Sequence, residues 1–148
     1  MKSLQKIFSL FLLCLCFAAF ASDGGGGGGA GTKPKPIPLD PVIASAQSAI
    51  ADKEWELAID VLRKALVQKP GNADYHNLYA YSMRHSRNPD MEKVFSHYAE
   101  ALRIEPKHRG AHEYIGEAYL QFNNLAKAKE HLAVLDKLCF SRVRNTTI

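Results

Sequence analysis

A repeat period of 34 to 36 residues constrains the fold of this chain more than any other feature. In one series, Ala46, Ala80 and Gly116, consecutive residues are 34 and 36 positions apart. In a second series, Ala58, Val94 and Ala128, they are 36 and 34 positions apart. Fixed-period self-similarity of this length indicates a stack of like helical units. The aligned columns are Ala46, Ala80 and Gly116; Ala58, Val94 and Ala128; Trp55, Met91 and Leu125; Leu62, Tyr98 and Leu132; and Ala65, Ala101 and Leu135. We therefore predict an all-α fold of three helical hairpins, with two extra residues in the turn 85–88.

The pattern resembles the tetratricopeptide repeat, a helix–turn–helix unit of about 34 residues. The resemblance covers residues 39–138 and implies an α-α superhelix of three tetratricopeptide hairpins at 39–72, 73–108 and 109–140. Val42 and Ser45 depart from the family, which prefers Trp and Leu there. The residues that carry the resemblance are Ala58, Leu62, Ala65 and Pro70; Val94, Tyr98, Ala101 and Pro106; and Ile115, Gly116, Tyr119 and Ala128.

Helical spacing predicts six helices at about 40–51, 54–68, 73–86, 89–105, 108–122 and 125–139. Asp52 is the expected cap of the second helix, because a carboxylate can accept from the exposed amides of a helix start. For the fourth helix we expect Asn88 as the cap and Pro89 in the first helical position. Pro70 and Pro106 each close a repeat, since proline cannot continue a helix.

The two ends of the chain are predicted to lie outside the repeats. Residues 1–21 have the pattern of a secretory signal peptide: Lys2 and Lys6, an apolar run, and Ala19-Phe20-Ala21 as a cleavage site. An uncleaved anchor is the alternative. Residues 22–38 combine a glycine run with alternating prolines and are expected to form a linker. The mature chain would then be periplasmic or secreted, from a bacterium, with no membrane span after signal removal.

Residues 141–148 are predicted to be an irregular tail. The exported bacterial proteins that this chain resembles continue after the third repeat with a sequence such as CFFSCEEYDDL and a further helix. Loss of one T from a run of five in the coding sequence would convert that continuation into Cys139–Ile148 as found here. We therefore hypothesise a one-base frameshift, which would leave the third repeat uncapped and make it a candidate homodimer surface.

The charge of the chain argues against nucleic acid as a partner. The net charge is +4, but six of the 19 basic residues and one of the 15 acidic residues lie outside 40–140. The repeats therefore carry 13 basic and 14 acidic residues, a balance of −1, without the basic face that nucleic-acid binding needs. Cys139 would be the one cysteine left after signal cleavage, so no internal disulfide is expected.

The predicted functional surface is the concave side of the superhelix, where the resemblance implies that exposed residues of first helices bind a partner peptide or loop. The candidates are Asn77, Tyr81, Arg84, His85, Glu113, Glu117 and Gln121, with Ile43 and Gln47 in the first repeat. Tyr and Arg are the types that dominate binding energy at interfaces. The family's clamp for a C-terminal carboxylate is absent, because Ile43, Gln47, Gly110 and Tyr114 occupy its columns. The predicted function is therefore a protein-binding scaffold without catalysis or cofactor.

A metal- or redox-handling protein using His108, His112 and Cys139 is the alternative. His108 and His112 are one helical turn apart and could share an ion. Against this, His76 and His112 occupy one repeat column and His97 and His131 another, which indicates repeat architecture. His112-Glu113 is followed by Gly116 where a metalloprotease motif needs its second histidine.

Overall fold

The computed structural model describes residues 40–144, with side chains described for residues 40–140. It contains α2 (Pro41–Ala51), α3 (Trp55–Gln68), α4 (Ala73–His85), α5 (Met91–Ile104), α6 (Arg109–Gln121) and α7 (Leu125–Arg144), and no strand in this range. The predicted signal peptide, the linker and the last four residues of the predicted tail lie outside the described residues. Within the described part, no helix is long and apolar enough to cross a bilayer.

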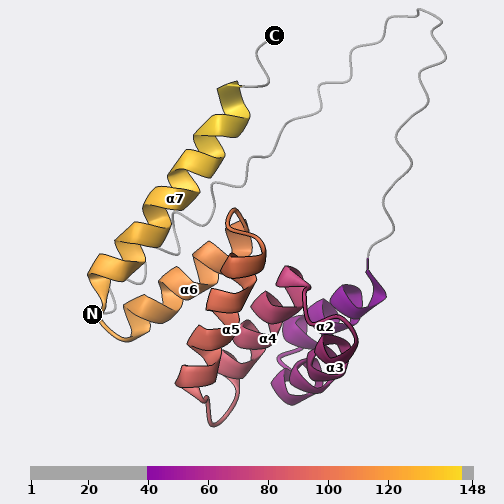
Figure 1. The fold of residues 1–148 in the computed structure, drawn as a ribbon. Coiled ribbons are helices and arrows are strands. Elements are labelled where there is room, and N and C mark those ends of the chain that lie inside the picture. Colours follow the sequence, from indigo (N-terminus) through magenta and orange to yellow (C-terminus); the bar gives the residue numbers. More distant parts are fainter. Residues whose placement is uncertain (1–39, 145–148) are drawn as a thin grey trace, which may run out of the picture. The chain divides into compact units, whose positions relative to one another are not determined.

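The helices pair as three antiparallel hairpins, α2–α3, α4–α5 and α6–α7 (Figure 1). The aligned column Trp55, Met91 and Leu125 supplies the first residue of each second helix. Ala46, Ala80 and Gly116 are all buried, as expected for small residues that let paired helices approach. At Gly116 the nearest atoms are the Cβ of His131 and the carbonyl oxygen of Ala128 on α7.

The first helices form the inner layer of the stack. α4 contacts both α2 and α6, whereas within residues 40–144 the second helices α3, α5 and α7 do not contact one another. Because one layer is continuous and the other is spread apart, the stack curves with α2, α4 and α6 on the concave side. This geometry agrees with the predicted superhelix.

The hydrophobic core runs along the seams between consecutive helices. Ala46, Leu62, Ala65, Tyr75 and Leu78 form one buried cluster between the first hairpin and α4. The next cluster joins the second hairpin to α6 and consists of Ala80, Met83, Val94, Tyr98, Ile115 and Ala118. The phenol of Tyr75 also donates a 2.7 Å hydrogen bond to Asp40, the cap of α2, and so ties the first hairpin to the second.

The last hairpin is less covered than its predecessors. Leu62 and Tyr98 are fully buried, because α4 and α6 respectively follow them in the stack. Leu132, the aligned residue of α7, is only half-buried, and so is Leu135. Within the described residues α7 contacts α6 alone, so no helix covers the other side of these leucines.

Three local predictions were wrong. α7 continues to Arg144, because no proline or glycine follows Leu138 to end it, so residues 141–144 are helical and not an irregular tail. Asp52 ends α2 and does not cap α3, since Lys53 takes a left-handed backbone conformation (φ 60°) and moves the start of α3 to Trp55. Asp90 caps α5 in place of Asn88, accepting from the Lys93 amide at 3.2 Å, so Pro89 lies before the helix and not in its first position.

Candidate functional site

Aromatic rings from three helices meet on the concave side of the stack. Tyr81 of α4 lies 4.5 Å from Tyr114 of α6, 4.5 Å from His85, and 6.3 Å from Trp55 at the start of α3, between ring centroids. Trp55 and His85 stack at 5.0 Å. We call these four residues the aromatic strip. Two of them, Trp55 and Tyr114, were not among the predicted binding residues.

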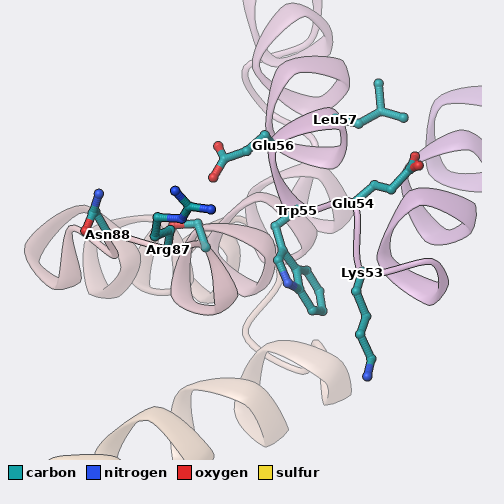
Figure 2. A pocket seen from close by; sticks show the side chains of 8 residues that line it. Lys53, Glu54, Trp55, Glu56, Leu57, Arg87 and Asn88 are labelled. Carbon is teal, nitrogen blue, oxygen red and sulfur yellow. The ribbon is translucent and has the colours of Figure 1, made fainter.

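The aromatic strip borders a hollow of about 670 Å³ between the start of α3 and the α4–α5 loop. It is lined by Lys53, Glu54, Trp55, Glu56, Leu57, Ser86, Arg87 and Asn88. Figure 2 shows Trp55 and Lys53 extending to one side of the α2–α3 turn while Glu56 and Leu57 point to the other. Trp55 is therefore the lining residue that connects this hollow to the rings of α4 and α6.

Burial and charge perturb the titrating groups of the strip. Burial raises the pKa of the Tyr81 phenol, and the neighbouring Glu117 carboxylate adds to the rise. Partial burial of the His85 ring lowers its pKa, and the Arg84 charge lowers it further. The pKa of Tyr114 rises to about 12, first because of burial and then because of the Glu113 charge. The carboxylates of α6 thus lie close to both tyrosines.

Arg84 is not the exposed residue that the sequence predicted. Its side chain is only 2% exposed, and its Nη2 donates a 2.7 Å hydrogen bond to Oε2 of Glu117. Its guanidinium also lies 5.5 Å from the centre of the Tyr81 ring. The residue faces the α4–α6 seam, so its charge joins two hairpins. A partner could bury no more of it.

Asn77 is likewise buried, with 4% of its surface exposed, where the sequence predicted an exposed residue. It lies beside Gly110 of α6: a Cβ atom on that glycine would be 3.0 Å from Asn77 Nδ2. Its Oδ1 has no hydrogen-bond partner in the described chain. The seam therefore holds an unpaired buried acceptor and, at Arg84 Nε, an unpaired buried donor.

The remaining predicted residues keep access to water. His85 and Gln121 are exposed, while Tyr81, Glu113 and Glu117 are half-buried. Burial raises the pKa of the Glu113 carboxyl, the Glu117 charge adds to the rise, and Arg109 opposes it. In the first repeat Gln47 is exposed and Ile43 is half-buried on α2. The structure thus brings Tyr81, His85 and the α6 carboxylates together across the α4–α6 seam.

The three residues of the metal-site alternative make other contacts. His108 Nε2 is 3.0 Å from Asp74, and its Nδ1 accepts the Ala111 amide as the cap of α6. His112 pairs with His131, and Arg109 Nη2 is 3.6 Å from the Cys139 sulfur. Among the described residues no group of three or more His, Cys, Asp or Glu side chains could hold a metal ion.

The histidine columns form two hydrogen-bonded pairs that repeat along the stack. The Nδ1 atoms of His76 and His97 are 2.8 Å apart, and those of His112 and His131 are 2.9 Å apart. The Nε2 atoms of His76 and His112 face the carbonyl oxygens of Pro70 and Pro106. A carbonyl only accepts, so these Nε2 atoms donate, and the hydrogen between the paired Nδ1 atoms belongs to His97 or His131. Each pair joins the two helices of one hairpin.

The helices and their packing define an all-α helical repeat superhelix, which confirms the predicted fold class and supports the tetratricopeptide resemblance. Similar solved structures include MamA 41-end from Desulfovibrio magneticus RS-1, with 19% identity over 68% of this chain and TM-score 0.60. Another is a MamA RS-1 ArsTM double mutant, with 19% identity over 68% of this chain and TM-score 0.61. The chain spans 55% and 56% of those two chains. No family model and no curated protein matches the sequence.

Proposed function

We propose that this chain is an exported protein-interaction scaffold that binds a peptide or loop of a partner protein on its concave side, without catalysis of its own. The aromatic strip is the observation that carries the proposal. Tyr and Trp supply much of the binding energy at protein interfaces. Here they come from three different helices and remain partly accessible to water.

The rigidity of the surface supports the same function. Arg84 and Glu117 join α4 to α6, and buried clusters join the first hairpin to α4 and the second hairpin to α6. A surface ordered before binding loses less conformational entropy when the partner docks.

Capture of partners by immobilised full-length protein tests the site. We expect the variant Tyr81→Ser to lose the captured partner, and Val67→Ser to retain it. Val67 is a matched control because it is a 75% exposed apolar residue of α3. Equal capture by both variants would remove the aromatic strip as the binding surface, provided that circular dichroism shows equal helicity.

Export is proposed from the pattern of residues 1–21. The processed protein should be found in the periplasm or the medium, with Ser22 as its first residue. Recovery of the full-length chain from the cytosol would refute this part of the proposal.

Self-association through α7 is a second interaction that one observation favours. Leu132 and Leu135 are half-buried where their counterparts in earlier repeats are covered by the next helix. We propose a homodimer through this surface. Light scattering should show a dimer that Leu135→Ser converts to a monomer, whereas a monomer at all concentrations would exclude it.

A further inference from the structure

The carboxylate of Glu113 lacks a counter-charge at a place where a ligand would supply one. It is half-buried on α6, and it makes no hydrogen bond and no ion pair within residues 40–140. Burial and the Glu117 charge raise the pKa of Glu113, and the charge of Arg109 on the same helix opposes this rise. Arg109, however, is exposed, and its Nη2 lies against the Cys139 sulfur of α7.

The second carboxylate of this surface is only partly neutralised. Arg84 donates to Oε2 of Glu117, and the same guanidinium is buried in the α4–α6 seam. It does not form an ion pair with Glu113 as well. Of these two carboxylates one helical turn apart, Glu117 pairs with the buried Arg84 and Glu113 does not, which leaves a negative charge at the surface.

The seam beside these carboxylates also contains two buried polar atoms without a hydrogen-bond partner in the described chain, the acceptor Asn77 Oδ1 and the donor Arg84 Nε. Asn77, Tyr81 and Arg84 lie on one face of α4, at helical spacing, opposite Gly110, Tyr114 and Glu117 of α6. Asn77 is more than nine-tenths buried in this seam, and its Oδ1 has no donor. Its other amide atom, Nδ2, is the one directed at Gly110. Since Asn77 and Arg84 are buried, the Glu113 carboxylate is the unpaired group of this region that a partner could reach.

The rings beside these acceptors suit a cation in their own right. The Arg84 guanidinium lies 5.5 Å from the centre of the Tyr81 ring, and the centre of the Tyr114 ring lies 4.5 Å from it. A guanidinium has five N–H donors and no acceptor, and it stacks on aromatic faces. An anionic segment would instead meet uncompensated carboxylates.

We propose that the surface formed by Tyr81, Glu113, Tyr114 and Glu117 binds an arginine side chain in the docking segment of the partner. This inference rests on the proposed function and adds the chemistry of the ligand. The partner's guanidinium would pair with Glu113 and lie against the Tyr81 and Tyr114 rings. The partner is thus a protein with a basic, extended segment.

Two fluorescent peptides separate charge from shape. The first alternates glycine and arginine, and the second replaces each arginine by citrulline, which has the same shape without the charge. Fluorescence anisotropy with full-length protein should show at least about tenfold tighter binding of the arginine peptide, which corresponds to one charge-assisted contact.

Variants locate the contact. Glu113→Gln, which keeps the size of the side chain, should weaken arginine-peptide binding about tenfold, and Glu92→Gln should change it less than twofold. Glu92 is a matched control because it is an exposed glutamate on the outer helix α5. Equal weakening by both variants would show general charge attraction and overturn the proposal.

Two further outcomes would also overturn it: equal affinity for both peptides, or no binding of either at millimolar concentration. If the citrulline peptide binds as tightly as the arginine peptide and Tyr81→Ser abolishes this binding, the arginine site is rejected and the aromatic strip is supported. The partner-capture comparison of Tyr81→Ser with Val67→Ser does not depend on these peptides, so failure of the two proposals can be told apart.

Discussion

The two histidine pairs predict that acid weakens the stack. In each pair the Nδ1 atoms are within 2.9 Å, so a proton on both rings would place two N–H groups against each other. The folded state therefore holds at most one extra proton per pair, whereas the unfolded chain protonates all four rings at low pH. Burial lowers the pKa of His97 and His131, and their partner rings lower it further.

The sign of the effect follows from these lowered pKa values. The unfolded state binds more protons below the ordinary histidine pKa of about 6.5, so stability is complete above that pH and falls below it. A ring that cannot take up a proton in the folded state lowers the free energy of unfolding by about 2 kcal/mol when the pH falls from about 7 to about 5. Two such rings can therefore lower the free energy of unfolding by at most about 4 kcal/mol. Because both rings are partly exposed, solvent screening reduces the expected loss to about 2 kcal/mol.

Neighbouring charges modify the effect without reversing it. Glu100 raises the pKa of His97, and Glu130 raises that of His131, while Lys127 lowers the latter. His85 also has a lowered pKa and adds to the acid sensitivity in the same direction. A comparison of variants is therefore needed to isolate the contribution of the pairs.

The double variant His97→Asn with His131→Asn makes this comparison. The asparagine amide can donate from about the position of the ring Nδ1 but does not titrate. The free energy of unfolding can be measured in urea by circular dichroism. Between about pH 7 and about pH 5 it should fall by about 2 kcal/mol less in the variant than in the wild type. Parallel pH dependence of the two proteins would refute the reasoning.

Two further substitutions test the α4–α6 seam. Arg84→Met should destabilise the fold by about 2 kcal/mol, less than for a fully buried pair, because Glu117 loses its partner but keeps 28% exposure; urea unfolding measures this, and an unchanged midpoint would contradict the structural role given to Arg84. Tyr98→Phe should leave stability unchanged or raise it by up to about 1 kcal/mol, because the buried Tyr98 hydroxyl makes no hydrogen bond of ordinary geometry in the described chain. The Arg84 guanidinium is near enough to oppose the rise that burial causes in the pKa of this hydroxyl. A loss above about 1 kcal/mol in the same assay would show that the hydroxyl is bonded to Arg84.

Repeat spacing allowed the helices to be predicted but not the depth of individual side chains. The second helices were predicted to begin at about 54, 89 and 125 and begin at Trp55, Met91 and Leu125, because small and apolar residues must recur where hairpins pack. Asn77, Tyr81 and Arg84 share one face of α4, and spacing alone does not show which of them enters the seam with α6. Arg84 is buried in the seam because its guanidinium pairs there with Glu117, which is 33 residues away in the sequence.

Two other features also depend on tertiary contacts. Trp55 belongs to a column of helix starts, and nothing local indicates that its ring reaches Tyr81 and His85. The histidine pairs were visible as columns, whereas their hydrogen bonds follow only from the hairpin geometry. Local signals at helix ends were similarly incomplete, since the left-handed Lys53 shifted the start of α3.

Photo-crosslinking in living cells tests the central claim most directly, that the concave side of the stack holds a partner protein. A photoreactive phenylalanine analogue would replace either Tyr81 on the aromatic strip or Val67 on the outer helix α3. We predict a discrete adduct with one partner from position 81 and none from position 67. Adducts from position 67 alone, or from neither position, would contradict the account.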